Sequence, residues 1–169
     1  MELLATIDLD RVSNENIKSF TIRNASRAVV FDADNNVAIL HVTKQQYHKL
    51  PGGGVEDGED FKEALFRECR EEIGCNIEIL SELGKIVEHR IQQSLVGVSY
   101  CYIAKVKGEK GTPDFTEKEL SKGFAIQWMP IQEAIELIGN ESPNDYIASF
   151  IVKRDLTFLL EAQKRILSS

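Results

Sequence analysis

Short apolar runs along the chain predict where strands lie. Residues 28–31 and 37–40 are rich in β-forming side chains, and the polar residues 32–36 between them predict a hairpin turn. Further strands are predicted at 77–80, 85–90, 95–106 and 124–129. The run 95–106 is apolar on both faces, which is typical of a strand at the centre of a sheet.

Helical periodicity appears in three segments, 60–73, 131–138 and 143–167. In the first, Asp60 can cap the amino end together with Glu63, and Gly74 supplies the residue that ends a helix. Gly139 is expected to end the second helix, and Pro143 is expected at the first position of the third.

The remaining segments are expected to be irregular. Residues 1–25 are ambiguous apart from a short strand around Ile7, and 107–123 is predicted to be a polar loop. Strands surrounded by three helices predict an α/β (α+β) fold. The 169 residues suit one domain, 1–169, with a core at about 26–140 and a carboxyl-terminal helix at about 143–167.

The charge of the chain is concentrated in one stretch. The net charge is −7, and residues 52–82 carry ten acids against three bases, so the remainder is neutral. An acidic chain is a poor partner for nucleic acid or for an anionic membrane surface. No apolar run approaches the roughly 18 residues of a membrane helix, and the amino terminus lacks a signal-like pattern. We therefore expect a cytoplasmic protein with reduced cysteines.

The acidic helix suggests a metal site. At about 100° per residue, Glu68, Glu71 and Glu72 fall within one arc beside the apolar face. Carboxylates at this spacing repel one another, and a hard divalent cation such as Mg²⁺ removes the conflict. An acidic face is also typical of a merely solvated helix. The run 52–54, three glycines, favours the metal site because it allows the backbone to approach a metal or phosphate closely.

The segment GGGVEDGEDFKEALFRECREEIGC resembles the signature of the Nudix hydrolase superfamily (MutT-like), G-x5-E-x7-R-E-U-x-E-E-x-G-U, where U is a bulky apolar residue. Every fixed position is filled, by Gly53, Glu59, Arg67, Glu68, Glu71, Glu72 and Gly74. Cys69 and Cys75 occupy the two U positions, and we expect them to alter packing rather than chemistry. The looser likeness outside this segment covers about residues 26–140.

The resemblance implies a mixed-sheet α/β/α sandwich and a pyrophosphohydrolase. Such an enzyme cleaves a small-molecule nucleoside diphosphate derivative by water attack on phosphorus, with Mg²⁺ or Mn²⁺. By similarity, the metal ligands are Glu68, Glu71, Glu72 and the carbonyl of Gly52. Gly53, Glu59 and Arg67 would lie behind them, and Arg67 would orient the carboxylates.

The resemblance leaves the general base open between Glu71, Glu72 and a carboxylate from a distal loop. That loop, 107–123, offers Glu119, which we favour, and Glu117. Arg27, Lys44 and Lys49 lie near the glycine loop in sequence and could meet phosphate, although we expect each of them to be solvated.

The substrate subclass stays open. Four aromatic residues could stack on a base or sugar, although each suits the core better: Tyr47, Tyr100, Tyr102 and Trp128. One alternative is a non-catalytic Nudix-like module that binds a nucleotide in a regulatory role, and such modules usually lose a metal-site acid. Another is an RNA-decapping or RNA-binding role, which needs a basic track that the sequence does not display. A homodimer is compatible with the sequence.

Overall fold

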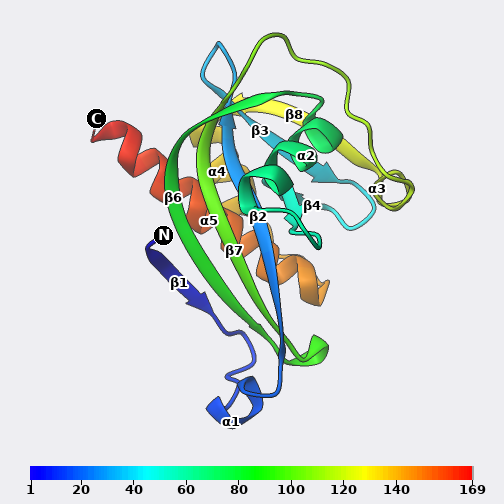
Figure 1. Ribbon diagram of the computed structural model, residues 1–169, viewed down its shortest axis with the longest axis vertical. Helices are drawn as coiled ribbons and strands as arrows, with labels where there is room; N and C mark the ends of the chain where they lie inside the picture. Colours follow the sequence, from blue (N-terminus) through cyan, green and yellow to red (C-terminus); the bar gives the residue numbers. More distant parts are fainter. Residues whose placement is uncertain (169) are drawn as a thin grey trace.

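The computed structural model describes residues 1–168 and contains one mixed sheet with helices on both faces (Figure 1). Its elements, in chain order, are β1 Leu3–Ile7, α1 Asn14–Ile17, β2 Thr21–Phe31, β3 Asn36–Val42, β4 Tyr47–Lys49, β5 Gly52–Gly54, α2 Phe61–Ile73, β6 Ile77–Arg90, η1 Ile91–Gln93, β7 Leu95–Val106, α3 Glu117–Lys122, β8 Phe124–Pro130, α4 Ile131–Gly139 and α5 Tyr146–Leu167. The sheet order is β1-β6-β7-β2-β3-β4, with β5 paired to β2 and β8 paired to β3. Strands β1/β6 and β2/β7 pair in parallel and the others pair antiparallel.

The helices form two outer layers. Helix α2 lies on one face of the sheet, and α4 and α5 lie on the other (Figure 1). On the α2 side, Leu65, Cys69 and Ile73 pack with Cys75 and with apolar residues of the sheet. On the opposite side, Phe150 and Phe158 of α5 belong to a larger buried cluster. The predicted α/β/α arrangement with a mixed sheet is therefore confirmed, and the cysteines at the two U positions are buried as expected.

The long strands hold the sheet together. Strand β7 lies between β6 and β2, so its prediction as a central strand is confirmed. The prediction of two separate strands at 77–80 and 85–90 is wrong, because the single strand β6 contains both segments. Its register against β7 shifts between Ile79 and Ser81 and again between Glu82 and Gly84. The residues left out of the pairing are Leu80 and Leu83, so the strand is locally irregular at these two points without ending.

Local side-chain caps fix the ends of the acidic helix. Asp60 accepts hydrogen bonds from the backbone N–H groups of Lys62 and Glu63, and Glu63 reaches back to the N–H of Asp60. Gly74 ends the helix with φ +65°, in the left-handed region. Both predicted ends of α2 are confirmed, so its glutamates are held in a defined register.

Three helices in the carboxyl-terminal half differ from the sequence prediction: one was not predicted, and two have different ends. Helix α3 lies inside the predicted polar loop, with a capping box between Thr116 and Glu119. Helix α4 continues through Gly139 instead of ending before it. Helix α5 begins at Tyr146, because the Asp145 side chain accepts from the N–H of Ala148 and caps it there.

The predicted hairpin turn at 32–36 is confirmed and is organised by Asp32. One carboxylate oxygen of Asp32 accepts from the backbone N–H groups of Asp34 and Asn36, at 2.9 and 2.8 Å. The other lies 2.5 Å from the ammonium of Lys110. Burial opposes the charged form of Asp32, but Lys110 and the two amides outweigh it and lower the pKa of this carboxyl.

Asp32→Asn is expected to lower the free energy of unfolding by about 1–2 kcal/mol at pH 7. Because the pKa of Asp32 is lower in the folded state, its stabilisation is complete above the unfolded value of about 4 and is lost as the pH falls through the folded value. Urea unfolding at several pH values measures this. Asp34→Asn, at an exposed position of the same turn, is the control. A difference between the two variants that stays constant down to pH 2 would contradict this account.

Candidate active site

The glycine loop runs close against strand β2. Gly52 pairs with Arg27 and Gly53 with Ser26. Gly52 has φ +127°, and a Cβ there would lie 2.2 Å from the backbone oxygen of Ser26. A Cβ on Gly53 would lie 2.1 Å from a carboxylate oxygen of Glu68. The backbone contact and the positive φ therefore require glycine at position 52. At position 53 a side chain would instead displace the carboxylate of Glu68 from its place beside the loop.

Glu72 is the most deeply buried acid of α2, with 1% of its surface exposed. One carboxylate oxygen accepts from the backbone N–H of Gly52 at 2.7 Å, and the other from Lys49 Nζ at 2.6 Å. Burial raises the pKa of Glu72, although Lys49 opposes this shift. Lys49 is itself only 8% exposed, so the expectation that it is solvated is wrong.

Arg67 links the loop to three carboxylates. Its Nε and Nη2 donate to the two oxygens of Glu59 at 2.7 and 3.0 Å, and Nη2 also donates to the carbonyl of Gly54 at 3.1 Å. Its Nη1 lies 2.9 Å from Glu68 and 3.5 Å from Glu71. The paired guanidinium lowers the pKa of Glu59 to about 2. Arg67 thus sits where it can orient the carboxylates.

A third element brings Glu119 to the acidic helix. One carboxylate oxygen from each of Glu68, Glu72 and Glu119 lies within 4.8 Å of the other two. Glu71 is half-buried beside this group and faces Arg67. Burial raises the pKa of Glu71, and the nearby charges of Glu68 and Glu119 act in the same direction. Among the described residues, Glu117 is not part of this group.

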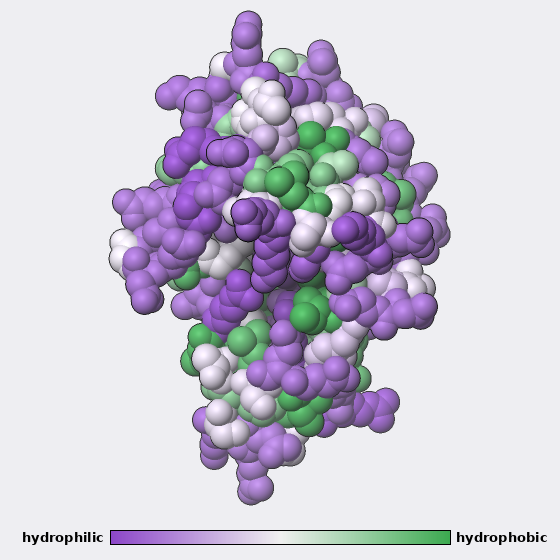
Figure 2. Space-filling model, turned by 90° about the vertical axis from the view of Figure 1, so that its right-hand side faces the viewer, coloured by the Kyte–Doolittle hydropathy of each residue, from purple (hydrophilic) through white to green (hydrophobic). Residues whose placement is uncertain are grey.

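Glu68, Glu72 and Glu119 line a cavity of about 240 Å³ between α2, α3 and α5, whereas Glu71 is not among its lining residues. Its lining residues are Arg23, Arg27, Tyr47, Lys49, Gly52, Gly53, Gly54, Glu68, Glu72, Thr116, Lys118, Glu119, Lys122, Phe124, Ile151 and Arg154. Figure 2 shows the side of the molecule on which α3 and β4 lie, and hydrophilic residues surround a hollow there.

Six cationic residues line this cavity together with the acids, and Arg27 is one of them. Its Nη1 donates to the carbonyl of Gly52. Burial lowers the pKa of Arg27, and the neighbouring Arg154 cation adds to this shift. The expectation that Arg27 is solvated is therefore wrong. Lys44 lies in a separate surface depression, lined by residues 44–46 and 142–145.

Aromatic side chains divide between this cavity and the core. Tyr47 is buried and lines the cavity, whereas Tyr100 packs on Phe61 at a ring-centroid distance of 4.2 Å. Trp128 lies under the ammonium of Lys110, 4.0 Å from its ring centroid. Tyr47 is thus the aromatic residue, of the four considered from sequence, that faces the acids.

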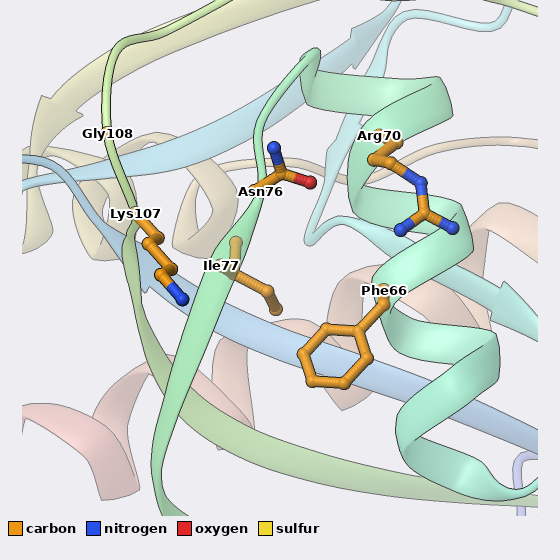
Figure 3. Close-up of a pocket in the computed structure, with 6 residues that line it drawn as sticks. All are labelled: Phe66, Arg70, Asn76, Ile77, Lys107 and Gly108. Carbon is orange, nitrogen blue, oxygen red and sulfur yellow. The ribbon is translucent and has the colours of Figure 1, made fainter.

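Another cavity, of about 630 Å³, lies between α2, the start of β6 and the segment that follows β7 (Figure 3). Phe66 and Arg70 of α2 face it, together with Asn76, Ile77 and Lys107 (Figure 3). None of the acids discussed above lines it. Its size alone therefore does not make it the reactive site.

The donor set of the acidic group suits a hard divalent cation. Carboxylate and carbonyl oxygens are the ligands that Mg²⁺ and Mn²⁺ prefer. Glu68 and Glu72 are both nearly excluded from solvent. The carbonyl of Gly52 lies beside them but accepts from Arg27 Nη1 and Lys49 Nζ, so these cations would have to release it before it could join the ligands. Three carboxylates gathered at this distance repel one another, and a cation between them removes that repulsion.

The fold and the site define an α/β/α protein in which a glycine loop lies against an acidic helix and carboxylates gather beside it. A NUDIX domain model matches residues 21–150. The chain is 30% identical over 88 residues to an RNA pyrophosphohydrolase of Pelagibacter ubique, covering 50% of this chain and 56% of that protein. It is 35% identical over 106 residues to an RNA pyrophosphohydrolase of Campylobacter jejuni, covering 59% and 68%.

The fold is also similar to that of solved Nudix proteins. A NUDIX hydrolase from Nitrosomonas europaea superposes with a TM-score of 0.60 at 14% identity, covering 79% of this chain and 88% of that one. The chain belongs to the Nudix family. The match to the Pelagibacter relative spans little more than half of that protein's length. No helix among residues 1–168 is long and apolar enough to span a membrane.

Proposed function

We propose that this protein is a metal-dependent pyrophosphohydrolase that cleaves a nucleoside diphosphate linked to another moiety. The observation that carries the proposal is the convergence of Glu68, Glu72 and Glu119 beside the glycine loop. The complete family signature and the names of the relatives support the same activity. The rival proposal, a non-catalytic nucleotide-binding module, is disfavoured because none of the metal-site acids is missing.

Each group of residues around the cavity has its own role in the proposed hydrolysis. Glu68, Glu71, Glu72 and the Gly52 carbonyl would hold Mg²⁺ or Mn²⁺, which when bound activates water and neutralises phosphate charge. Arg67 and Glu59 keep the carboxylates in position. Lys49 and Arg27 provide positive charge for the diphosphate on the other side of the cavity.

A general base must accept the proton of the attacking water, and we propose Glu119 for this role, with Glu71 as the alternative. Both hydrogen bonds that Glu119 accepts from Thr116 go to Oε2, so this capping box leaves Oε1 for a water molecule. Glu71 is an alternative because its raised pKa makes it a stronger base than an ordinary carboxylate.

The substrate is proposed to be a small, soluble nucleotide derivative in the cytoplasm, acted on by a single domain. A second candidate, the 5′ end of RNA, is favoured by the name RNA pyrophosphohydrolase that the relatives carry. The homodimer stays a prediction.

The proposal is tested with the full chain, Mg²⁺ or Mn²⁺, and a substrate panel. The panel contains (d)NTPs, oxidised dGTP, ADP-ribose, nucleotide sugars, NADH, dinucleoside polyphosphates and 5′-triphosphorylated RNA, with phosphate and pyrophosphate release as the readout. We expect metal-dependent turnover of at least one member that Glu71→Gln and Glu72→Gln both reduce. No turnover of any member, or turnover that neither substitution affects, would overturn the proposal.

A further inference from the structure

A second, smaller cavity adjoins the acidic one and is lined by arginines. It has a volume of about 120 Å³, and four arginines from β2, β6 and α5 face it: Arg23, Arg27, Arg90 and Arg154. Three of these, Arg23, Arg27 and Arg154, also line the acidic cavity, so the two spaces share a wall. No assigned role in hydrolysis uses Arg23, Arg90 or Arg154.

The buried arginines keep hydrogen-bond donors without a partner. Arg154 is 1% exposed and Arg90 is 8% exposed. Among the described residues, Arg154 Nη2, Arg90 Nε and Arg27 Nε are buried and make no hydrogen bond. An unsatisfied buried N–H of a charged group is costly, so three around one cavity indicate a missing acceptor.

The acids beside this cavity balance only part of the positive charge. Glu88 accepts two hydrogen bonds from Arg90 Nη2, at 3.0 and 3.1 Å, and lies 3.6 Å from Arg154 Nη1. Asp155 accepts from Arg154 Nε at 2.7 Å and from the backbone N–H of Leu50 at 2.8 Å. Four arginines thus face these two carboxylates, and of the four Arg27 also lies near Glu68 and Glu72 of the acidic site.

The size and the lining of the cavity suit a small anionic group. Its volume equals that of about four water molecules, far below the roughly 300 Å³ of a pocket for a whole organic ligand. Guanidinium groups match the oxygens of phosphate in planar, paired hydrogen bonds. Ile147 and Ile151 of α5 form the apolar side and offer no competing acceptor from their side chains.

We propose that the arginine cavity binds the terminal phosphate of the substrate, while the neighbouring phosphates lie at the acidic site. The inference rests on the proposed function and deepens it. A substrate that fills both cavities carries a free terminal phosphate, as a 5′-triphosphate does. A diphosphate capped at both ends, as in ADP-ribose, leaves the arginines without their acceptor.

The test compares binding of ATP and ADP-ribose to the full chain by isothermal titration calorimetry, with Ca²⁺ in place of Mg²⁺ so that a cation offsets the charge of the carboxylates. The two ligands share adenosine and the first two phosphates, and no turnover is needed. We expect ATP to bind at least about tenfold more tightly than ADP-ribose, and Arg90→Gln to remove that difference. Arg70→Gln, which removes an exposed arginine on α2, is the matched control and should leave both affinities unchanged.

Two further variants guard against a folding defect. Arg23→Gln removes an exposed arginine at the edge of the cavity and leaves the buried arginines in place. It should weaken the binding of ATP more than the binding of ADP-ribose. Arg90→Lys should restore part of the preference, because it keeps the charge and loses the paired geometry. The proposal would be overturned if wild-type protein bound the two ligands with equal affinity. It would also be overturned if Arg23→Gln and Arg90→Gln each lowered the affinities for ATP and for ADP-ribose by the same factor.

The same experiment distinguishes two sources of the triphosphate. A short RNA with a 5′-triphosphate that binds more tightly than ATP, with the same dependence on Arg90, indicates an RNA 5′ end. Equal or weaker binding of the RNA indicates a free nucleotide. Failure of the substrate panel with Mg²⁺ would reject the hydrolase but leave this binding preference measurable, so the two proposals fail separately.

Discussion

Glu72→Gln is expected to weaken Mn²⁺ binding by at least about a hundredfold, which corresponds to about 2.7 kcal/mol, and to reduce hydrolysis by a similar factor or more. Glu72 is the acid most completely removed from water, and its two oxygens face Lys49 and the Gly52 amide. Glutamine keeps the shape of the side chain but removes the charge. The ligand set then loses a full negative charge where water cannot replace it.

The same substitution leaves Lys49 as a buried cation without its ion-pair partner, so a loss of stability must be separated from a loss of chemistry. Thermal unfolding of the variant provides that separation. Glu63→Gln lies on the same helix and preserves the capping box, so it controls for charge removal. Metal binding by Glu72→Gln equal to that by Glu63→Gln would contradict the assignment.

Gly52→Ala is expected to destabilise the fold by about 3 kcal/mol or more. The added Cβ would meet the backbone of Ser26 at 2.2 Å and the Cα of Arg27 at 2.9 Å, and neither is a flexible group that can move aside. The φ of +127° is strained for alanine in addition. For a chain of this size, the melting temperature should fall by about 6–12 °C.

Gly58→Ala separates backbone strain from the steric clash. Gly58 also has a positive φ, +88°, but a Cβ there meets nothing within 4 Å. Gly58→Ala should therefore lower the free energy of unfolding by only about 1–2 kcal/mol. Urea unfolding of both variants gives the comparison. Equal destabilisation would show that the close approach of β5 to β2 is not what requires glycine at position 52.

The parts of the fold that short-range rules determine could be predicted from the sequence. The capping box of Asp60 and Glu63 and the left-handed Gly74 fix α2 locally, and the turn at 32–36 is organised within five residues. The same kind of local signal, Thr116 followed by Glu119, begins α3, but the polar residues around it show no helical periodicity that would predict a helix. The start of α5 was misplaced because Asp145, rather than Pro143, supplies the cap.

The candidate site could be predicted only in part, because its remaining contacts are long-range. The family pattern predicts the acids of α2 and points to a distal acid, and Glu119 is the loop acid that lies beside them. The burial of Lys49 against Glu72 depends on the pairing of separate elements and leaves no mark in residue spacing. Arg90 and Arg154 likewise come from β6 and α5, far apart in the chain.

The structure also refines the interpretation of the charge. The net charge of −7 lies within residues 52–82, and the rest of the chain is formally neutral. That neutrality conceals an uneven arrangement, because four arginines outside the acidic segment meet at one cavity next to it. The result is an acidic site suited to cations beside a basic site suited to phosphate, which a bare charge count cannot show.

The central claim is that the glutamates of α2 hold a divalent metal ion, and Mn²⁺ titration followed by electron paramagnetic resonance tests it most directly. The signal of free Mn²⁺ reports binding without any knowledge of the substrate. Wild-type protein and Glu63→Gln are predicted to bind Mn²⁺ alike, and Glu72→Gln is predicted to bind at least about a hundredfold more weakly. Undiminished Mn²⁺ binding by a folded Glu72→Gln variant would contradict the claim.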